Sequence, residues 1–283
     1  MLYIGSHVGF NKEKQLLGSL EEALSYGSNT FMFYTGAPQN TIRYQINDDL
    51  TKKAYELMNE KKIDLSKIIV HAPYIVNLAN PDQEKHTFAI NFLKQEIKRC
   101  ESLGISLMVL HPGSHVGFGV DIGIKNIVDG LNEIIKEDHS VSILLETMAG
   151  KGHEVGRNFF EIKKIIDGIK DKTKIGVCMD TCHMHDAGYD LNDFNTLLDE
   201  FDKIVGLHYV KCIHINDSKN PKGSGKDRHE NLGKGYIGLD NLLNVIYNPR
   251  VDNITKILET PYVNDYPPYK EEIKMIKSDE RYK

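Results

Sequence analysis

The stretch SLMVLHPG, residues 106–113, joins a short apolar run to a histidine and a Pro-Gly turn. A run of five to eight residues that is bounded by turn residues predicts a buried β-strand. The same pattern recurs at regular spacing in seven other segments: LYIGSHV (2–8), TFMFYT (30–35), KIIVHAP (67–73), VSILLET (141–147), KIGVCMDT (174–181), KCIHIND (211–217) and TKILETP (255–261). The sequence therefore predicts eight strands.

Helix-like stretches lie between these strands. Thr87–Gly104 is apolar at i, i+3 and i+4 and ends in Gly, and residues 126–138 and 158–172 follow the same pattern. Eight strands that alternate with helices predict a (β/α)8 TIM barrel, here as a single domain over residues 1–283. An open doubly wound sheet is the alternative, but no G-x-G-x-x-G turn opens a first helix.

Composition adds few constraints. The net charge of −5 gives no global indication of nucleic-acid binding. No apolar run approaches the ~18 residues that a membrane span needs, and the N-terminus lacks the pattern of a signal peptide. The four cysteines have no disulfide-framework spacing. We expect reduced thiols in a cytoplasmic, monomeric protein that has no membrane contact.

Polar residues close the apolar runs, where a parallel barrel carries its functional groups. Nine of them are metal-ligand types, recurring about every 30 to 40 positions where one βα unit ends: His71, His111, Glu146, Asp180, His183, His214, Asp227, His229 and Glu259. A barrel would bring them to one rim, where four acids repel one another and buried polar groups lack partners. Divalent cations would relieve both problems.

Nine donors exceed the needs of one tetrahedral zinc ion. Two ions could be served, but three ions fit better if one carboxylate bridges. Because all nine donors are nitrogen or oxygen, Zn²⁺ is the first choice, with Mn²⁺ or Fe²⁺ as alternatives at some positions. Asp227 and His229 suit a shared ligand pair, since alternate residues of an extended segment face the same way.

The stretch DTCHMHD, residues 180–186, looks by itself like a compact Cys/His zinc site. No other donor of the cluster is sulfur, so we interpret Cys182 as a packed thiol. His185 and Asp186 are not assigned to metal. His7, which closes the first strand, is expected to support the ligands or the substrate.

Several motifs resemble the endonuclease IV family of apurinic/apyrimidinic (AP) endonucleases. They run in order from residue 3 to about residue 260: YIGSHVG (3–9), HAPYIVNLA (71–79), VLHPGSHVG (109–117), LLETMAGKG (144–152), VCMDTCHMHDAGYD (177–190), HINDSKNPKGSGKDRHENLGKGYIG (214–238) and ILETP (257–261). The resemblance implies a three-zinc TIM barrel that hydrolyses the phosphodiester 5′ to an abasic site in duplex DNA. It divides the nine positions into three ligand sets: His71, His111 and bridging Glu146; Glu146, Asp180, His214 and Glu259; and His183, Asp227 and His229.

Two metals that share a carboxylate can also share and activate a water, which makes Glu146 and Glu259 the candidate catalytic residues. Residues that fill the gap left by an extracted abasic sugar act as wedges. The resemblance points to Tyr74 and Ile75 as wedges. It also points to position 39, where the family commonly has Arg and this chain has Gln39.

The glycine-rich segment 218–229 carries Lys219, Lys222, Lys226 and Arg228. We expect Lys222, Lys226 and Arg228 to contact DNA phosphates. Three Zn²⁺ ions would change the balance of −5 to about +1, so that the attraction for DNA is concentrated at the rim.

Two other functions are compatible with such a barrel. A metal-dependent sugar isomerase or epimerase uses one or two metals, which leaves Asp227, His229 and the basic loop unexplained. A non-catalytic binder of damaged DNA has no need of a full ligand set. The resemblance also implies trimming of blocked 3′ ends.

Overall fold

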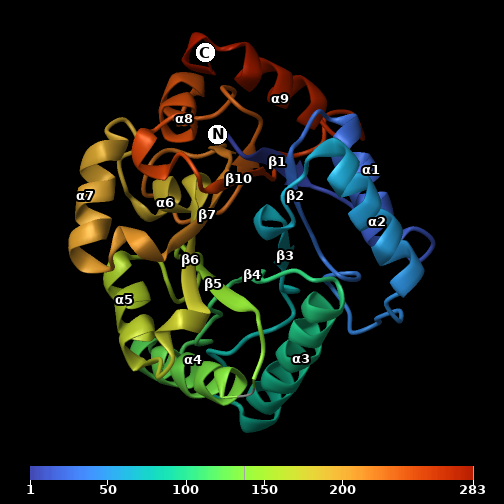
Figure 1. The fold of residues 1–283 in the computed structure, drawn as a ribbon. Helices are drawn as coiled ribbons and strands as arrows, with labels where there is room; N and C mark the ends of the chain where they lie inside the picture. Colours follow the sequence, from blue (N-terminus) through green and yellow to red (C-terminus); the bar gives the residue numbers. More distant parts are fainter. Residues whose placement is uncertain (137, 283) are drawn as a thin grey trace.

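The computed structural model describes residues 1–136 and 138–282, and eight strands within these ranges close into a parallel barrel (Figure 1). The order around the barrel is β1-β10-β7-β6-β5-β4-β3-β2, and β1 pairs with β10 to close it. The predicted TIM barrel and its eight strands are confirmed. The strands of the barrel are β1 (Ile4–His7), β2 (Thr30–Phe33), β3 (Ile69–His71), β4 (Leu107–Leu110), β5 (Ser142–Glu146), β6 (Ile175–Asp180), β7 (Val210–Ile215) and β10 (Thr255–Leu258).

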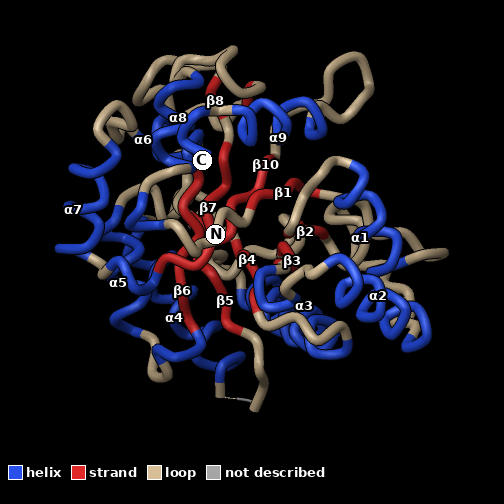
Figure 2. The backbone as a smooth tube through the Cα atoms, turned by 45° about the horizontal axis from the view of Figure 1, so that its top comes forward, coloured by secondary structure: helices blue, strands red, loops and turns tan. Residues whose placement is uncertain are grey.

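Helices surround the barrel, as both views of the chain show (Figures 1 and 2). They are α1 (Gln15–Ser25), α2 (Asp48–Lys61), α3 (Gln83–Ser102), α4 (Val120–Ile135), α5 (Phe159–Gly168), α6 (Thr181–Ala187), α7 (Phe194–Ile204), α8 (Leu239–Ile246) and α9 (Tyr269–Ser278). Short 3₁₀ turns are η1 (Leu65–Lys67), η2 (Lys172–Lys174), η3 (Leu207–Tyr209), η4 (Pro249–Val251) and η5 (Glu280–Tyr282). No helix in the described ranges is long and apolar enough to cross a membrane.

The helix predicted at Thr87–Gly104 begins earlier than expected, at Gln83, because the side chain of Asp82 accepts the N–H of Lys85 and caps it. The helix predicted over residues 126–138 is the second half of α4, which ends at Ile135. Residue 137 lies outside the described residues.

The interior of the barrel is a packed apolar layer, to which seven strands contribute one residue each: Met32, Ile69, Val109, Leu144, Cys178, Cys212 and Ile257. Side chains alternate along a strand, so the residue two positions further also points inward, one layer nearer the C-terminal rim. Six of these seven positions are followed two residues later by a predicted ligand: His71, His111, Glu146, Asp180, His214 and Glu259. Strand geometry thus gathers these six ligands directly above the packed layer.

A small antiparallel ribbon is added to the rim and was not predicted. It pairs β8 (Asp217–Ser218) with β9 (His229–Glu230), with Ser218 opposite His229. The ribbon folds the basic segment back on itself and brings its far end to the top of the barrel.

Candidate metal centre

Glu146 lies at the centre of the cluster at the rim. Its side chain is 1% exposed, and its two oxygens face different imidazoles. Oε2 lies 3.2 Å from His71 Nε2 and 3.1 Å from His111 Nε2. Oε1 lies 3.2 Å from His183 Nδ1 and 3.1 Å from His214 Nδ1. One carboxylate therefore faces two separate groups of donors.

A second group of donors adjoins Oε1. His214 Nδ1 lies 3.0 Å from Glu259 Oε2 and 3.8 Å from Asp180 Oδ2. One ligand atom from each of Glu146, Asp180, His214 and Glu259 lies within 4.8 Å of every other. The same is true of the group formed by His71, His111 and Glu146. Two adjoining groups therefore share Glu146.

A third group lies toward the β8–β9 ribbon. Ligand atoms of Asp180, His183 and His229 lie within 4.8 Å of one another. Asp227 Oδ1 is 3.1 Å from His183 Nε2 and 3.7 Å from His229 Nε2. The structure thus brings all nine sequence-predicted donors into one connected cluster.

The expected reason for pairing Asp227 with His229 is wrong. Asp227 has φ +53°, which is left-handed rather than extended, and β9 begins only at His229. The two side chains meet because the chain turns sharply at Asp227, not because they alternate along one strand.

Carbonyl groups orient three of the imidazoles. His71 Nδ1 lies 2.7 Å from the Ala72 carbonyl, His183 Nδ1 lies 2.9 Å from that of Thr147, and His229 Nδ1 lies 3.2 Å from that of Glu259. A ring that donates Nδ1–H to a carbonyl presents Nε2 as an acceptor, which is the form that binds metal.

Asn216 and Thr147 are site residues that the sequence analysis missed. Asn216 Nδ2 donates to Asp180 Oδ2 at 2.8 Å, and Asn216 Oδ1 accepts the N–H of Glu259 at 3.0 Å. Thr147 Oγ1 accepts the N–H of Asp180, which in turn caps α6 through the N–H of His183. A sequence signal did exist for Asn216, because it lies two residues after His214, just past the end of β7, at the spacing of one strand face.

Asp186 was set aside as a ligand, yet it holds the loop that carries Asp227. It is 1% exposed at the end of α6. Its Oδ1 accepts from Ser218 Oγ at 2.7 Å, and its Oδ2 accepts the N–H of Asp227 at 2.8 Å and that of Lys226 at 3.2 Å. The left-handed backbone at Asp227 is costly for a non-glycine residue, so these bonds are what keep it in place.

The carboxylates and imidazoles of the cluster shift the pKa values of one another. Burial favours the neutral form of Glu146, but the imidazoles of His214 and His111 outweigh burial and hold the pKa of Glu146 well below its usual value. The pKa of Glu259 is lowered for the same reason, chiefly by His214. Burial lowers the pKa of His214, but Cys178 and, after it, Glu259 and Glu146 outweigh burial and raise this pKa well above its usual value. Glu146 and Glu259 thus stay ionised and favour a bound cation.

Of the residues proposed as wedges, Tyr74 is 55% exposed, whereas Ile75 is partly buried against the core. Gln39 is exposed on a turn after β2. Arg43, the cation of this loop, lies inside it, with Nε 2.6 Å from Glu96 Oε1 and a guanidinium N–H donated to the Asn40 carbonyl. Arg43 therefore shapes the loop and does not supply a charge at its tip.

The three predicted DNA contacts of the glycine-rich loop, Lys222, Lys226 and Arg228, are exposed. Lys222 Nζ pairs with Asp190 at 3.0 Å. Lys226 and Arg228 flank Asp227, and Arg228 donates to the Asp227 carbonyl at 3.2 Å. Two cations thus stand directly beside a predicted ligand.

Two other expectations concern residues next to the cluster. The His7 ring lies 4.8 Å from that of Tyr34, which lies 5.1 Å from that of His71. Burial lowers the pKa of His7 to about 4, so it is neutral near pH 7. Cys182 is fully buried in α6.

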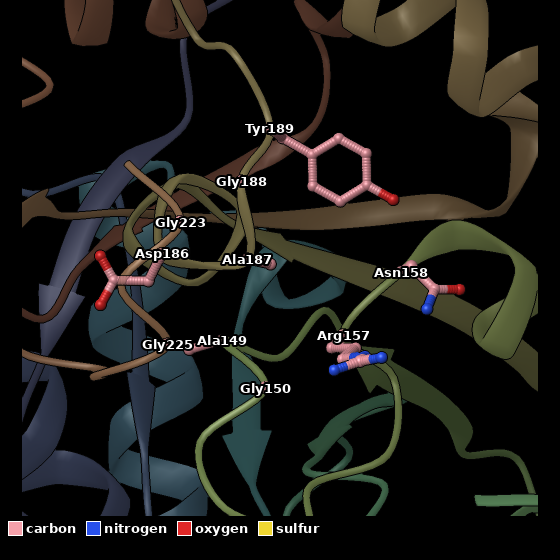
Figure 3. Close-up of a pocket in the computed structure, with 10 residues that line it drawn as sticks. All are labelled: Ala149, Gly150, Arg157, Asn158, Asp186, Ala187, Gly188, Tyr189, Gly223 and Gly225. Atoms are coloured by element: carbon pink, nitrogen blue, oxygen red, sulfur yellow. The ribbon is translucent and has the colours of Figure 1, made fainter. Parts of the chain in front are cut away.

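A cleft of about 500 Å³ lies between the loop after β5, the end of α6 and residues 223–225 (Figure 3). Arg157, Asn158 and Tyr189 line one side, and the Asp186 carboxylate points away from them. None of the nine predicted ligands, all of which the structure describes, lines this cleft.

Comparison with known proteins shows the class of barrel to which the chain belongs. Residues 20–279 match the family model of xylose isomerase-like TIM barrels. A D-tagatose 3-epimerase-like protein shares the fold, with a TM-score of 0.72, 19% identity and 96% of each chain covered.

The particular family follows from closer relatives. A protein of Acholeplasma laidlawii described as a probable endonuclease 4 is 56% identical, over 98% of this chain and 95% of the relative. The crystal structure of endonuclease IV from Thermus thermophilus matches with a TM-score of 0.83 and 27% identity, with 98% of each chain covered. The chain belongs to the endonuclease IV family.

Proposed function

We propose that this chain is a metal-dependent DNA-repair endonuclease that hydrolyses the phosphodiester 5′ to an abasic site in duplex DNA. It would leave a 3′-hydroxyl and a 5′-deoxyribose phosphate. The observation that carries this proposal is the cluster of nine nitrogen and oxygen donors joined through Glu146. The names of close relatives, which include a probable endonuclease 4, support it.

The donors suit divalent ions. Two ligands of one tetrahedral zinc lie roughly 3.3 Å apart, and the distances from His214 Nδ1 to its carboxylates, 3.0–3.8 Å, are similar. Within the described part of the chain His229 Nε2 has no hydrogen-bond partner, although it is buried and faces Asp180 at 3.8 Å and Asp227 at 3.7 Å. A cation between these three atoms would satisfy all of them.

Three ligand sets follow for three Zn²⁺ ions, with Mn²⁺ or Fe²⁺ as alternatives at some positions. They are His71, His111 and Glu146; Glu146, Asp180, His214 and Glu259; and His183, Asp227 and His229. When bound, the ions would lower the pKa of water and neutralise phosphate oxygens.

Glu146 and Glu259 are the proposed catalytic residues. Glu146 is 1% exposed and holds four imidazoles in position, whereas the Glu259 side chain is 18% exposed. We assign Glu259 to orient the attacking water and accept its proton, because it is the carboxylate that solvent and substrate can reach.

Exposed residues of the rim loops would hold the DNA. Tyr74 would enter the space left by an extracted abasic sugar, with Ile75 supporting its loop, and Gln39 would offer hydrogen bonds without charge. Lys226 and Arg228 would contact phosphates next to the third ligand set, and Lys222 would add a weaker contact. We also propose that the chain acts as a single-domain, cytoplasmic monomer, and that the same rim trims blocked 3′ ends.

The alternative of a sugar isomerase or epimerase rests on fold alone, since the epimerase-like neighbour is only 19% identical. Asp227 and His229, with the cations beside them, have no part in a one- or two-metal isomerase site. A non-catalytic binder of damaged DNA would leave the nine donors without a use.

The test is incision of a duplex that carries one synthetic abasic site, with an undamaged duplex as the control. Nicking at the 5′ side of the lesion is expected, with loss after exhaustive chelation and recovery after Zn²⁺ is restored. A metal-loaded protein that leaves the abasic duplex intact would contradict the proposal, and turnover of a ketose instead would favour the epimerase.

A further inference from the structure

Two cysteines lie side by side directly beneath the rim. Cys178 of β6 and Cys212 of β7 are register partners in neighbouring parallel strands, and both are fully buried. They belong to the apolar interior layer, together with Leu144 and Ile257. His214 follows Cys212 by two positions, so its ring lies on the same strand face, one layer above the thiols.

His214 differs from the histidines whose rings donate to carbonyls. Its Nδ1 faces the carboxylates of Glu146 and Glu259, at 3.1 and 3.0 Å. Its Nε2 is buried and, in the ranges that the structure describes, has no nitrogen or oxygen partner. A ring nitrogen of His214 and the two Sγ atoms lie within 4.8 Å of one another. Since Nδ1 is already occupied, Nε2 is the nitrogen available to the sulfurs.

We propose that Cys178, Cys212 and His214 form a further metal site, adjoining the rim cluster, which takes a soft, thiophilic cation of low coordination number such as Cu(I). Sulfur donors select soft ions, whereas the rim above offers only nitrogen and oxygen. The trio supplies three donors inside an apolar layer. A structural zinc ion takes four donors, so a three-donor site in an apolar layer suits Cu(I) better.

The protons that the ion displaces can be counted. Because Nδ1 of His214 serves the rim, Nε2 carries the N–H proton of the ring, so binding of one Cu(I) to Nε2 and to one thiolate releases that proton and one thiol proton, while the second sulfur can bind as a thiol. The trio with its ion would then carry one negative charge, which the divalent ion held by the same ring at the rim would offset, as a buried charge requires.

The site has a consequence for the rim. His214 would present Nε2 to the soft ion while its Nδ1 belongs to the nitrogen–oxygen cluster, so the two sites share one ring. An ion on the sulfur side would replace the Nε2 proton of that ring and so change how strongly the ring binds on the other side. Soft metal ions would therefore bind in the barrel core of this protein as well as at its rim.

The test is an anaerobic titration of the zinc-loaded protein with Cu(I), supplied from a coloured Cu(I) chelator that competes for the ion. We expect one Cu(I) per chain and a near-ultraviolet thiolate-to-copper absorption band. Cys212→Ala and Cys178→Ala should each weaken binding by at least about tenfold and reduce the band. Cys182→Ala removes another buried thiol outside the trio and is the matched control, with affinity and band unchanged.

Equal binding and an equal band in wild type and Cys212→Ala would overturn the proposal, as would the absence of a band. A second measurement on wild type does not depend on the folding of the variants. X-ray absorption of the Cu(I)-loaded protein should show sulfur in the copper shell, and a shell of nitrogen and oxygen alone would refute the site. Neither readout uses DNA, so this inference can fail without affecting the proposed incision activity.

Discussion

The two sides of the rim are held in different ways. His71 and His214 stand on barrel strands, and their side chains are 2% and 0% exposed. Asp227 and His229 stand on the loop and ribbon beyond β7, with 27% and 21% exposed. The first side is fixed by the backbone ladder, whereas the second depends on a few side-chain hydrogen bonds, chiefly those to Asp186. On the strand side, substitutions of the ligands themselves should impair metal binding. On the loop side, substitutions of the residues that support the ligands should impair it as well.

The largest effect is expected from Glu259→Gln on the strand side. The amide keeps the shape but cannot accept a proton at neutral pH, so incision should fall by about 10³-fold. Binding to the abasic duplex should remain measurable. The rate of incision in single turnover gives the first quantity, and a gel-shift or anisotropy titration gives the second.

Glu200→Gln, on the exposed face of α7, is the matched control and should keep wild-type activity. Near-normal cleavage by Glu259→Gln would refute the assigned role.

Asp186→Asn tests the loop side. The amide has one oxygen where the carboxylate has two, so it cannot accept both from Ser218 Oγ and from the backbone N–H groups of Lys226 and Asp227, and the left-handed turn loses part of its support. We expect metal content to fall toward two ions per chain, and incision to fall by about 10- to 100-fold, the usual effect of losing a support behind a ligand.

Asp190→Asn removes an exposed acid that pairs with Lys222 and should leave metal content unchanged. If Asp186→Asn keeps all its metal and its activity, the loop side does not depend on this contact.

The pH dependence of stability should differ between the metal-free and the metal-loaded protein. In the metal-free protein the raised pKa of His183 and His214 contributes stability that is fully present below pH 6.5 and is lost as pH rises through the raised values. The lowered pKa of Glu146 and Glu259 contributes stability that is present above pH 4.5 and is lost on acidification. Metal-free protein should therefore be most stable between these values.

Bound metal keeps the imidazoles deprotonated, so the loaded protein should show no such loss above pH 6.5. Melting curves from pH 5 to 9 should show a gap in Tm between the two forms that widens with pH by several degrees. Parallel curves for the two forms would indicate that the imidazoles are not part of the metal cluster.

The smallest effect is expected from single cations of the loop. Lys226→Ala should weaken binding of any duplex modestly and reduce the slope of log K against log salt concentration by about 1. Lys222→Ala is the comparison, and its change should be smaller because Lys222 already pairs with Asp190. A larger change at Lys222 than at Lys226 would reverse the proposed orientation of the DNA on this loop.

Most of the fold and the strand side of the rim follow from the sequence, because strands have a period of two. Apolar residues such as Ile69 and Leu144 precede His71 and Glu146 by two positions, which predicts both the barrel interior and the inward-facing donors. The same rule would have included Asn216, which supports Asp180 and Glu259 and was missed because it is not a ligand type.

The loop side could not be derived in the same way. The left-handed conformation of Asp227 and the bonds from the loop to Asp186 connect residues about 40 positions apart, and no local pattern encodes them. The inward position of Arg43 likewise follows from its pairing with Glu96, which belongs to α3. Contacts of this kind depend on the packed fold.

We propose that the nine donors hold three divalent ions as one working unit. The test is elemental analysis of the purified chain, combined with its incision of an abasic duplex as ions are removed and restored. We expect about three ions per chain and activity that returns only as the last ligand set fills. Full incision by protein that holds one ion or none would contradict it.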